Sequence, residues 1–296
     1  MQQWGADRIE ELTALVAAAA PGEDLSADEL LTACYERPGV VLGPATGEGA
    51  LALGLQRDRD GTLVAAVRLV VVHPEHRRSG VGRALLAEAE AWARDRGAER
   101  LELGGPTTFA LWSGIEPDSA LAALGAACGF AAGLEVRSYA VSTDFRAAPP
   151  EGVVVRRAVR DADVTAVTLQ VAASWPQLSD EVARSLDHGT CHVAVVAEEL
   201  TAGASPSSEG EPEIVGIGCH SVTRAGWVGP LVVAPAHRRR GNGLALLGQV
   251  CRDLMIAEML AAHVPAVDTP EVDAFVLAAE AAVGPTRRPM SKDLTD

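Results

Sequence analysis

The chain has 296 residues, enough for two domains of ordinary size, and 48% of them are hydrophobic, which is typical of a folded globular protein. A net charge of −15 argues against nucleic-acid binding, because phosphate backbones are bound by clustered lysines and arginines. The longest apolar runs have the length of strands, and the N-terminus has no basic region followed by an apolar stretch, so we expect no membrane partner and a cytoplasmic location.

The first half is predicted to begin with two helices and to continue with strands. The helices cover residues 9–20 and 26–37, and Ser26 has the side chain of a helix N-cap. We identify no strand ahead of the first helix. The elements that follow are strands over 40–42, 50–56 and 63–72, a helix over 83–96, a strand over 101–103, a helix near 119–128 and one or two strands within 134–145.

Residues 147–152 form the predicted linker, since this region holds two prolines and no hydrophobic period. The expected domains are therefore 1–146 and 153–296. The second half repeats the order of the first, with a strand over 153–157, helices over 161–173 and 180–187, a hairpin of 192–198 and 214–222, a strand over 227–233 and a helix over 244–260. The loop over 201–213 is rich in Ser, Gly, Pro and Glu, and we expect it to be mobile.

The tail after residue 263 is short for the elements that should follow the last helix, and it is broken by prolines. The first half, by contrast, ends with a strand within 134–145 that is available to pair elsewhere. We therefore predict that this strand crosses over and completes the second sheet.

A repeated segment is the most specific signal in the chain. Residues 70–86 read VVVHPEHRRSGVGRALL and residues 231–247 read LVVAPAHRRRGNGLALL, with eleven of the seventeen aligned positions identical. Each copy is a β-branched run, a Pro turn, an Arg-x-x-Gly-x-Gly sequence and an apolar helix start. Two glycines let backbone approach a ligand closely, and the free N–H groups of a helix start attract phosphate oxygens, so each copy predicts a diphosphate site.

Two familiar phosphate-binding loops do not fit these copies. A nucleoside-triphosphate loop needs Gly-x-x-x-x-Gly-Lys-[Ser/Thr], which neither copy contains. A dinucleotide loop needs a third glycine where Leu85 and Leu246 stand. With an arginine ahead of the glycines, both copies resemble the acyl-CoA loop of the GNAT superfamily of N-acyltransferases.

The element order and Cys128-Gly129-Phe130 are also similar to that family, over nearly the whole chain. The resemblance implies an α/β (α+β) fold of two tandem GNAT domains, each a mixed, mostly antiparallel twisted sheet flanked by helices. It implies acetyl-CoA as cofactor and a small-molecule amine as acceptor. The implied cofactor-binding residues are Val70, Val71, Val72, Arg77, Arg78, Ser79, Gly80, Val81, Gly82 and Arg83 in the first copy, and Leu231, Val232, Val233, Arg238, Arg239, Arg240, Gly241, Asn242, Gly243 and Leu244 in the second.

Catalytic residues are harder to predict. The family often uses a Glu on the strand before the loop as base and a Tyr on a following helix as acid, and neither unit has them at those positions. Acyl transfer could proceed without a side-chain base, by positioning and desolvation of the reactants alone. Alternatively, other side chains could replace the missing Glu and Tyr. The candidates are Glu102 in the first unit and His220 or Asp268 in the second. Each also has an ordinary structural explanation, as an exposed strand residue, a strand histidine and part of a helix cap.

Two functions from different classes remain. The first is an enzyme that moves an acetyl group from acetyl-CoA to a primary amine of a small molecule. The second is a catalytically degenerate acyl-CoA-binding or structural protein with one or both units inactive. The sequence does not decide which unit would be active, although family analogy favours the second. The scattered cysteines contain no C-x-x-C pair, and His188 to His192 fits a turn entering a strand, so we predict no metal.

Overall fold

The computed structural model describes residues 1–36, 39–58, 60–105, 108–197 and 213–295. The loop expected to be mobile lies almost wholly outside these residues. Contacts divide the chain into a first unit, Met1–Ser138 with Pro285–Asp296, and a second unit, Tyr139–Gly284. This division differs from the expected domains 1–146 and 153–296, because strands near residue 138 and at the C-terminus pair with the sheet of the other half.

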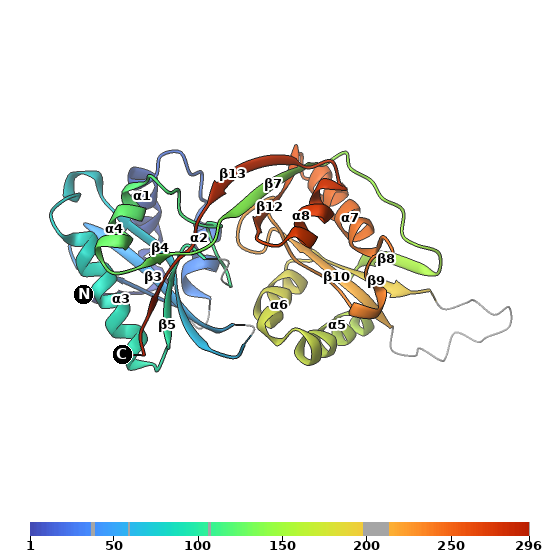
Figure 1. The fold of residues 1–296 in the computed structure, drawn as a ribbon, viewed down its shortest axis with the longest axis horizontal. Helices are drawn as coiled ribbons and strands as arrows, with labels where there is room; N and C mark the ends of the chain where they lie inside the picture. The colour runs from blue at the N-terminus through green and yellow to red at the C-terminus, as the bar shows by residue number, and fades with distance from the viewer. Residues whose placement is uncertain (37–38, 59, 106–107, 198–212, 296) are drawn as a thin grey trace. The chain divides into compact units, whose positions relative to one another are not determined.

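The first unit is a seven-stranded sheet in the order β1-β2-β3-β4-β5-β14-β6 (Figure 1). Neighbouring strands are antiparallel except β4 and β5, which run parallel. The strands are β1 (Gln2–Trp4), β2 (Gly39–Gly43), β3 (Gly49–Arg57), β4 (Leu63–Val72), β5 (Arg100–Leu103), β6 (Ala131–Ala132) and β14 (Met290–Asp293), and the helices are α1 (Ile9–Ala19), α2 (Ala27–Tyr35), α3 (Val81–Asp95) and α4 (Ala120–Ala127).

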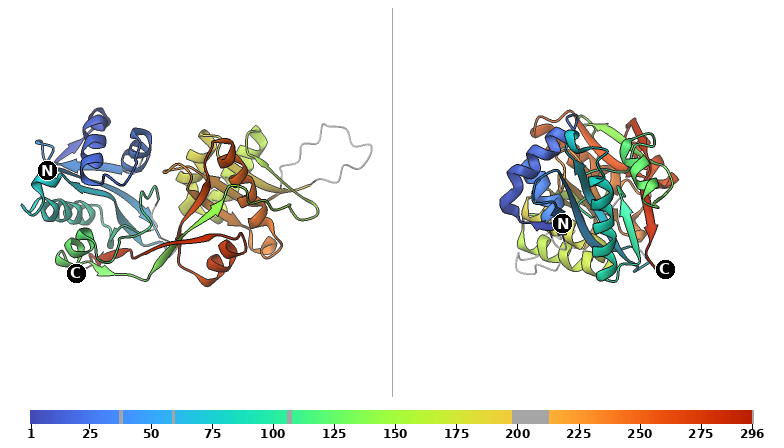
Figure 2. Two further views of the ribbon diagram at one scale, coloured as in Figure 1. Left: turned by 90° about the horizontal axis from the view of Figure 1, so that it is seen from above. Right: turned by 90° about the vertical axis from the view of Figure 1, so that its left-hand side faces the viewer.

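Helices cover both faces of this sheet. Leu12 and Leu30 of α1 and α2 pack on one face against Leu69 of β4, and Leu85 of α3 packs on the other against Leu53 of β3. Figure 2 shows α1 and α2 on the face opposite α3. Alternation along each strand directs successive side chains to these two cores. The predicted cap is confirmed, since Ser26 and Glu29 form a reciprocal capping box at the start of α2.

The second unit contains a four-stranded antiparallel sheet, β11-β10-β9-β8, and a three-stranded sheet, β12-β7-β13. In Figure 1, α5 and α6 lie on one side of β9 and β10, and α7 and α8 on the other. The strands are β8 (Val153–Arg157), β9 (Cys191–Val196), β10 (Ile214–His220), β11 (Val228–Val233), β12 (Ala261–Val267), β7 (Val136–Ser142) and β13 (Ala282–Arg287), and the helices are α5 (Asp161–Ser174), α6 (Ser179–Asp187), α7 (Asn242–Ile256) and α8 (Pro270–Leu277).

The two halves of the chain exchange a strand. β7, from the end of the first half, lies between β12 and β13, which confirms the predicted crossover of 134–145. The C-terminal β14 lies between β5 and β6 in return. The expectation that the first half lacks an opening strand is wrong, because Gln2–Trp4 pairs antiparallel with β2. Polar Gln2 and Gln3 are exposed there, so the segment lacks the apolar pattern of a buried strand.

Arg68 interrupts the regular pairing of β3 with β4. Ala52 pairs with Leu69 and Leu53 with Val67, so Arg68 is the extra residue of a β-bulge. Its buried guanidinium donates to the carbonyls of Ala33 (3.3 Å) and Glu36 (3.1 Å) at the end of α2. A cation at this end of a helix is favourable, because the last carbonyls lack partners and carry the negative end of the dipole.

Gly54 makes room for this guanidinium, since a Cβ there would lie 2.4 Å from the Cζ of Arg68. We expect Gly54→Ala to displace the guanidinium and destabilise the first unit by about 1.5–3 kcal/mol, the scale of one hydrogen bond to a charged group. Urea unfolding measures this loss. Gly22→Ala is the matched control, because no atom lies within 4 Å of that Cβ. Equal stability of the two variants would contradict the role given to Gly54.

Candidate functional site

The two copies of the repeat adopt the same backbone conformation. After β4 and β11 come short 3₁₀ turns, Pro74–His76 and Pro235–His237. Arg78 and Arg239 then have φ of 64° and 61°, and the helix N-caps Gly80 and Gly241 have φ of 96° and 91°. Glycine adopts this left-handed conformation without steric cost, which explains the first glycine of each motif. The sequence repeat is therefore also a structural repeat.

The helix starts offer free backbone donors. The first hydrogen bonds of α3 and α7 are from Ala84 to Gly80 and from Ala245 to Gly241. The preceding N–H groups, those of Val81, Gly82 and Arg83 and of Asn242, Gly243 and Leu244, find no acceptor in the described part of the chain. A Cβ on Gly80 would meet no atom within 4 Å, so space lies open beside these donors. Such an arrangement attracts an anion, and the helix dipole adds to the attraction.

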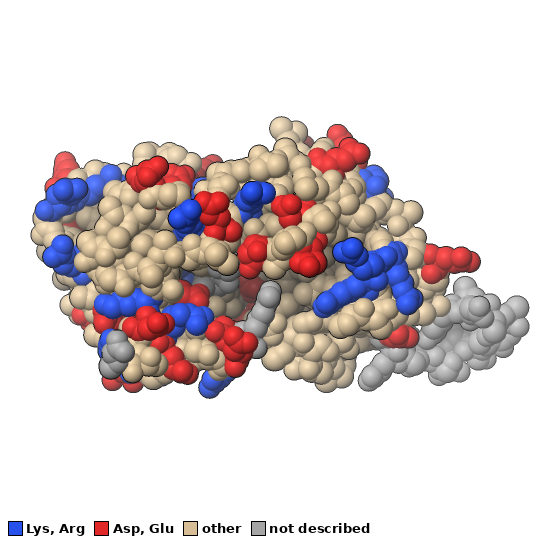
Figure 3. Space-filling model, in the orientation of Figure 1, with Lys and Arg blue, Asp and Glu red and all other residues tan. Residues whose placement is uncertain are grey.

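The motif arginines brace the loops. Nε of Arg77 donates to the Val72 carbonyl (3.4 Å) and Nε of Arg238 to the Val233 carbonyl (3.0 Å), the last residue of the strand in each case. Arg77 Nη2 also reaches the Ala19 carbonyl (2.6 Å). These side chains tie the turn to the strand while contributing positive charge. Figure 3 shows Lys and Arg side chains gathered on the second unit in the region of α7 and β8.

The strand before each loop leaves its neighbour after a bulge. β4 pairs with β5 only through Val64–Val67, so Val70, Val71 and Val72 pair with β3 alone among the described residues. In the second unit the register shift between β10 and β11 falls at Gly229-Pro230. β11 and β12 are joined in the described chain only by the bridge Trp227–His263, so Leu231, Val232 and Val233 are open on that side. An extended ligand can add to such an edge.

Glu102 lies on β5 beside the point where β4 and β5 part, opposite Ala66. Its Oε1 accepts hydrogen bonds from Nε (3.1 Å) and Nη2 (2.9 Å) of Arg100, which also contacts Asp58 (2.9 Å). The carboxylate is thus near the strand opening but engaged in an ion pair. Asp268 is exposed just ahead of Thr269, the N-cap of α8.

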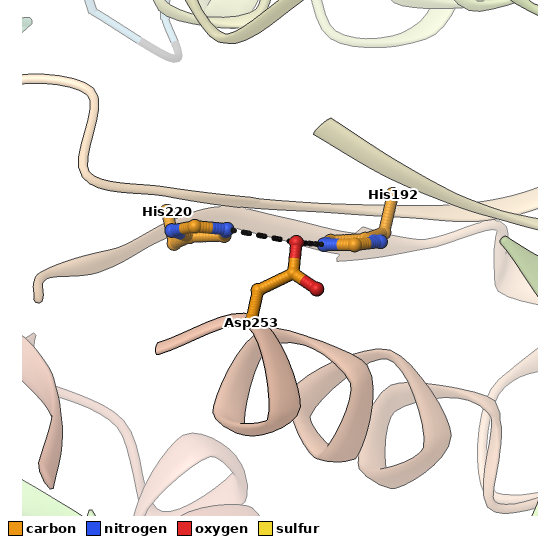
Figure 4. Close-up of side chains that lie close together, drawn as sticks. All are labelled: His192, His220 and Asp253. Carbon is orange, nitrogen blue, oxygen red and sulfur yellow. Dashed lines mark ion pairs between the residues drawn. The ribbon is translucent and has the colours of Figure 1, made fainter. Parts of the chain in front are cut away.

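His220, the third candidate, is buried in a cluster that the sequence analysis missed. Its Nε2 lies 3.6 Å from Oδ2 of Asp253 on α7, and the same oxygen lies 3.0 Å from Nε2 of His192 on β9 (Figure 4). The planes of the two rings lie within 16° of each other, and their centroids are 5.8 Å apart. Arg157 of β8 also contacts Asp253. Burial raises the pKa of the Asp253 carboxyl, but the contacts with His192, His220 and Arg157 outweigh it and hold the pKa below its usual range.

One signal in the sequence could have pointed to this cluster. Asp253 stands among Leu246, Leu247, Val250 and Leu254, on the helix face that packs on the sheet. A carboxylate on an apolar face requires a partner, and histidines on nearby strands can supply one.

Part of the chain matches a known protein family. Residues 10–110 match the model of the acetyltransferase (GNAT) family. No curated protein matches the chain. Within the described part of the chain, no helix is long and apolar enough to span a membrane.

Solved structures resemble the chain over nearly its full length. A tandem GNAT protein from the clavulanic acid biosynthesis pathway has a TM-score of 0.68 at 21% identity, with 99% of this chain and 98% of that chain covered. A GCN5-related N-acetyltransferase from Sphaerobacter thermophilus has a TM-score of 0.63 at 22% identity, with 99% of this chain and 95% of that chain covered. A glucosamine N-acetyltransferase region of a fungal multi-domain beta-N-acetylglucosaminidase has a TM-score of 0.74 at 16% identity. The match covers 98% of this chain and 38% of that chain.

These likenesses confirm the predicted mixed α/β fold of two tandem GNAT units. The family match falls on the elements that carry the first loop, and the fold likeness extends over both halves. The chain thus matches the acetyltransferase (GNAT) family over residues 10–110 and has the fold of tandem GNAT proteins over nearly its whole length.

Proposed function

We propose that this protein transfers an acetyl group from acetyl-CoA to a primary amine of a small-molecule acceptor. The observation that carries the proposal is the repeated loop, in which open helix N–H groups adjoin a strand edge free for pairing. The N–H groups would hold the diphosphate, and the strand edge would hold the amides of the pantetheine arm. The amine acceptor is supported by the name of the fungal relative, a glucosamine N-acetyltransferase.

The first unit is better equipped for the transfer step. The thioester oxygen becomes negatively charged during attack and requires a backbone N–H near the bulge. Leu69, next to the bulge residue Arg68, offers an N–H, whereas the aligned position of the second unit is Pro230, which has none. Glu102 also lies in the first unit, beside the strand opening. We therefore place turnover in the first unit, against the preference from family analogy.

A non-catalytic acyl-CoA-binding role is the second candidate, and the environment of the candidate bases favours it. Glu102 is paired with Arg100, His220 is buried against Asp253, and Asp268 is exposed at a helix start. Of the three, Glu102 lies at the strand opening, and its carboxylate is held in an ion pair with Arg100. Transfer by positioning alone, with water as proton acceptor, is the form of catalysis consistent with this arrangement.

Valine at the loop glycines tests the binding site. A β-branched residue at a left-handed position costs about 1–3 kcal/mol of strain, and it also fills the space beside the donors. We expect Gly80→Val and Gly241→Val each to weaken acetyl-CoA binding at its own loop by at least about tenfold, the equivalent of 1.4 kcal/mol. Calorimetric titration of acetyl-CoA measures both sites. Gly97→Val is the matched control, because Gly97 has φ of 71° with no atom near its Cβ but follows the opposite end of α3.

Thiol release from acetyl-CoA over a panel of amines tests the reaction. We expect Gly80→Val to lower turnover at sub-saturating acetyl-CoA by at least about tenfold and Gly241→Val to retain it. Tight acetyl-CoA binding without turnover for any amine would refute the enzyme and support the binding protein. Binding that survives in both loop variants would show that the site itself is misplaced. Turnover lost only with Gly241→Val would move catalysis to the second unit.

A further inference from the structure

His192, His220 and Asp253 form a buried cluster in which two imidazole rings share one carboxylate oxygen. His192 is fully buried; its Nδ1 has no hydrogen-bond partner among the described residues, and its Nε2 contacts the Asp253 carboxylate. Nε2 of His220 is also buried without a hydrogen bond. Each unsatisfied buried polar atom costs about 1–3 kcal/mol. A cation placed among the three side chains would bind both Nε2 atoms and the carboxylate together.

The spacing of the three side chains fits a single metal ion. One ligand atom from each residue lies within 4.8 Å of the other two. Zinc binds imidazole and carboxylate at about 2.0–2.2 Å, which places tetrahedral ligand atoms about 3.3 Å apart. The distances from Asp253 Oδ2 to His192 Nε2, 3.0 Å, and to His220 Nε2, 3.6 Å, lie on either side of that value. Figure 4 shows both rings directing a nitrogen at the carboxylate.

Neighbouring groups hold these side chains in place. Nδ1 of His220 lies 3.2 Å from Ser221 Oγ, which fixes the ring so that Nε2 faces the carboxylate. Arg157 contacts the carboxylate from β8, and its side chain is 47% exposed, so water screens its charge. Outer hydrogen bonds of this kind orient metal ligands.

We propose that His192, His220 and Asp253 bind one divalent transition-metal ion of the zinc class, which fastens α7 to strands β9 and β10. Two imidazoles and a carboxylate suit zinc, cobalt or iron and do not suit magnesium or calcium, which prefer oxygen ligands. The ion belongs to the second unit only. The position aligned with Asp253 in the first unit is Trp92, which packs against the apolar core.

Metal titration of the full chain, purified without a polyhistidine tag and stripped with a chelator, tests the proposal. We expect one Zn²⁺ or Co²⁺ per chain, and a higher melting temperature with the ion than without it. His220→Gln and Asp253→Asn should each weaken binding by about 100-fold or more, since even the loss of an outer partner costs about 10–100-fold. His188→Gln is the matched control, because His188 is an exposed histidine outside the cluster.

A ligand exchange separates loss of binding from loss of folding. His220→Cys replaces imidazole by thiolate and should still bind Co²⁺, with a new thiolate-to-cobalt charge-transfer band in the near ultraviolet. Circular dichroism of each metal-free variant checks its fold. No ion bound above the level of the His192/His220/Asp253 triple alanine variant would overturn the proposal. Equal loss in His188→Gln, or Co²⁺ bound by His220→Cys without the new band, would also overturn it, because the ion would then lie elsewhere.

Discussion

Deletion of residues 289–296 is expected to unfold the first unit while leaving the helices of the second unit protected. These residues carry β14, which pairs with β5 on one side and β6 on the other. Met290 and Leu294 are buried in the same core as Leu85 and Leu103. Truncating a buried Met or Leu to alanine costs about 2–5 kcal/mol, so the loss of both approaches the whole stability of about 5–15 kcal/mol of an ordinary domain.

Polar contacts add to this dependence. Lys292 Nζ donates to Glu90 Oε2 (2.6 Å) and to the Cys128 carbonyl (3.1 Å), and Arg94 donates to the Leu294 carbonyl (2.5 Å). Strand β14 thus holds α3, the helix that begins at the first loop. Without it, β5 would present an open edge.

Hydrogen exchange followed by mass spectrometry measures this prediction, because it reports each helix and strand separately. We expect peptides of α3 and β5 to exchange rapidly in the deletion variant, with peptides of α7 unchanged as an internal reference. Deletion of residues 295 and 296 alone is the control, since Thr295 is exposed. Equal protection of α3 in the two deletions would show that β14 does not stabilise the first unit.

Asp163→Asn is expected to destabilise the second unit by about 2–3 kcal/mol. The fully buried Asp163 side chain accepts from Nε (3.0 Å) and Nη2 (2.7 Å) of Arg156 and from Nε (3.1 Å) of Arg160. Breaking a buried ion pair costs about 3–5 kcal/mol, and the cost is smaller here because both arginines reach solvent.

The same carboxylate gives a defined pH dependence. Burial raises the pKa of Asp163, but hydrogen bonds from Arg156 and Arg160 outweigh burial and hold the pKa below its ordinary value. The folded state therefore binds the proton more weakly than the unfolded chain does. Its contribution to stability is complete above the unfolded pKa of about 3.9 and is lost as the pH falls through the lower folded pKa.

Urea unfolding of wild type and Asp163→Asn between pH 3 and pH 7 checks both statements. The difference in unfolding free energy is expected to be constant above about pH 5 and to shrink below about pH 4. Thr168→Val is a control on the exposed side of the same helix, and its difference should not change with pH. A difference for Asp163→Asn that is independent of pH would contradict the ion-pair explanation.

Local patterns in the sequence were sufficient for most elements of the fold. The helix expected over 83–96 is α3 at 81–95, and the strand expected over 63–72 is β4. Hydrophobic period, the Ser26 cap and the loop glycines are local causes, and each is readable in one segment. The short strand β1 was missed because pairing with β2, rather than its own composition, makes it a strand.

In the candidate site, likewise, some parts could be predicted from local sequence and others could not. Backbone N–H groups and glycines make the two loops, so a repeated motif predicts them without knowledge of the rest of the chain. A base or a metal ligand acts through a side chain whose neighbours come from distant segments. Glu102 meets Arg100 and Asp58, and His220 meets His192 and Asp253, through the packing of separate strands and helices.

The sequence by itself determined the duplication, the helices and strands, and the two loops with open donors, because each depends on residues close together in the chain. Only the tertiary structure decided which sheet receives each terminal strand and which titratable side chains come together. Those choices depend on contacts between residues far apart in sequence, such as Met290 beside Gly125 and Asp253 between His192 and His220. The free energy of such contacts exists only once the chain is folded.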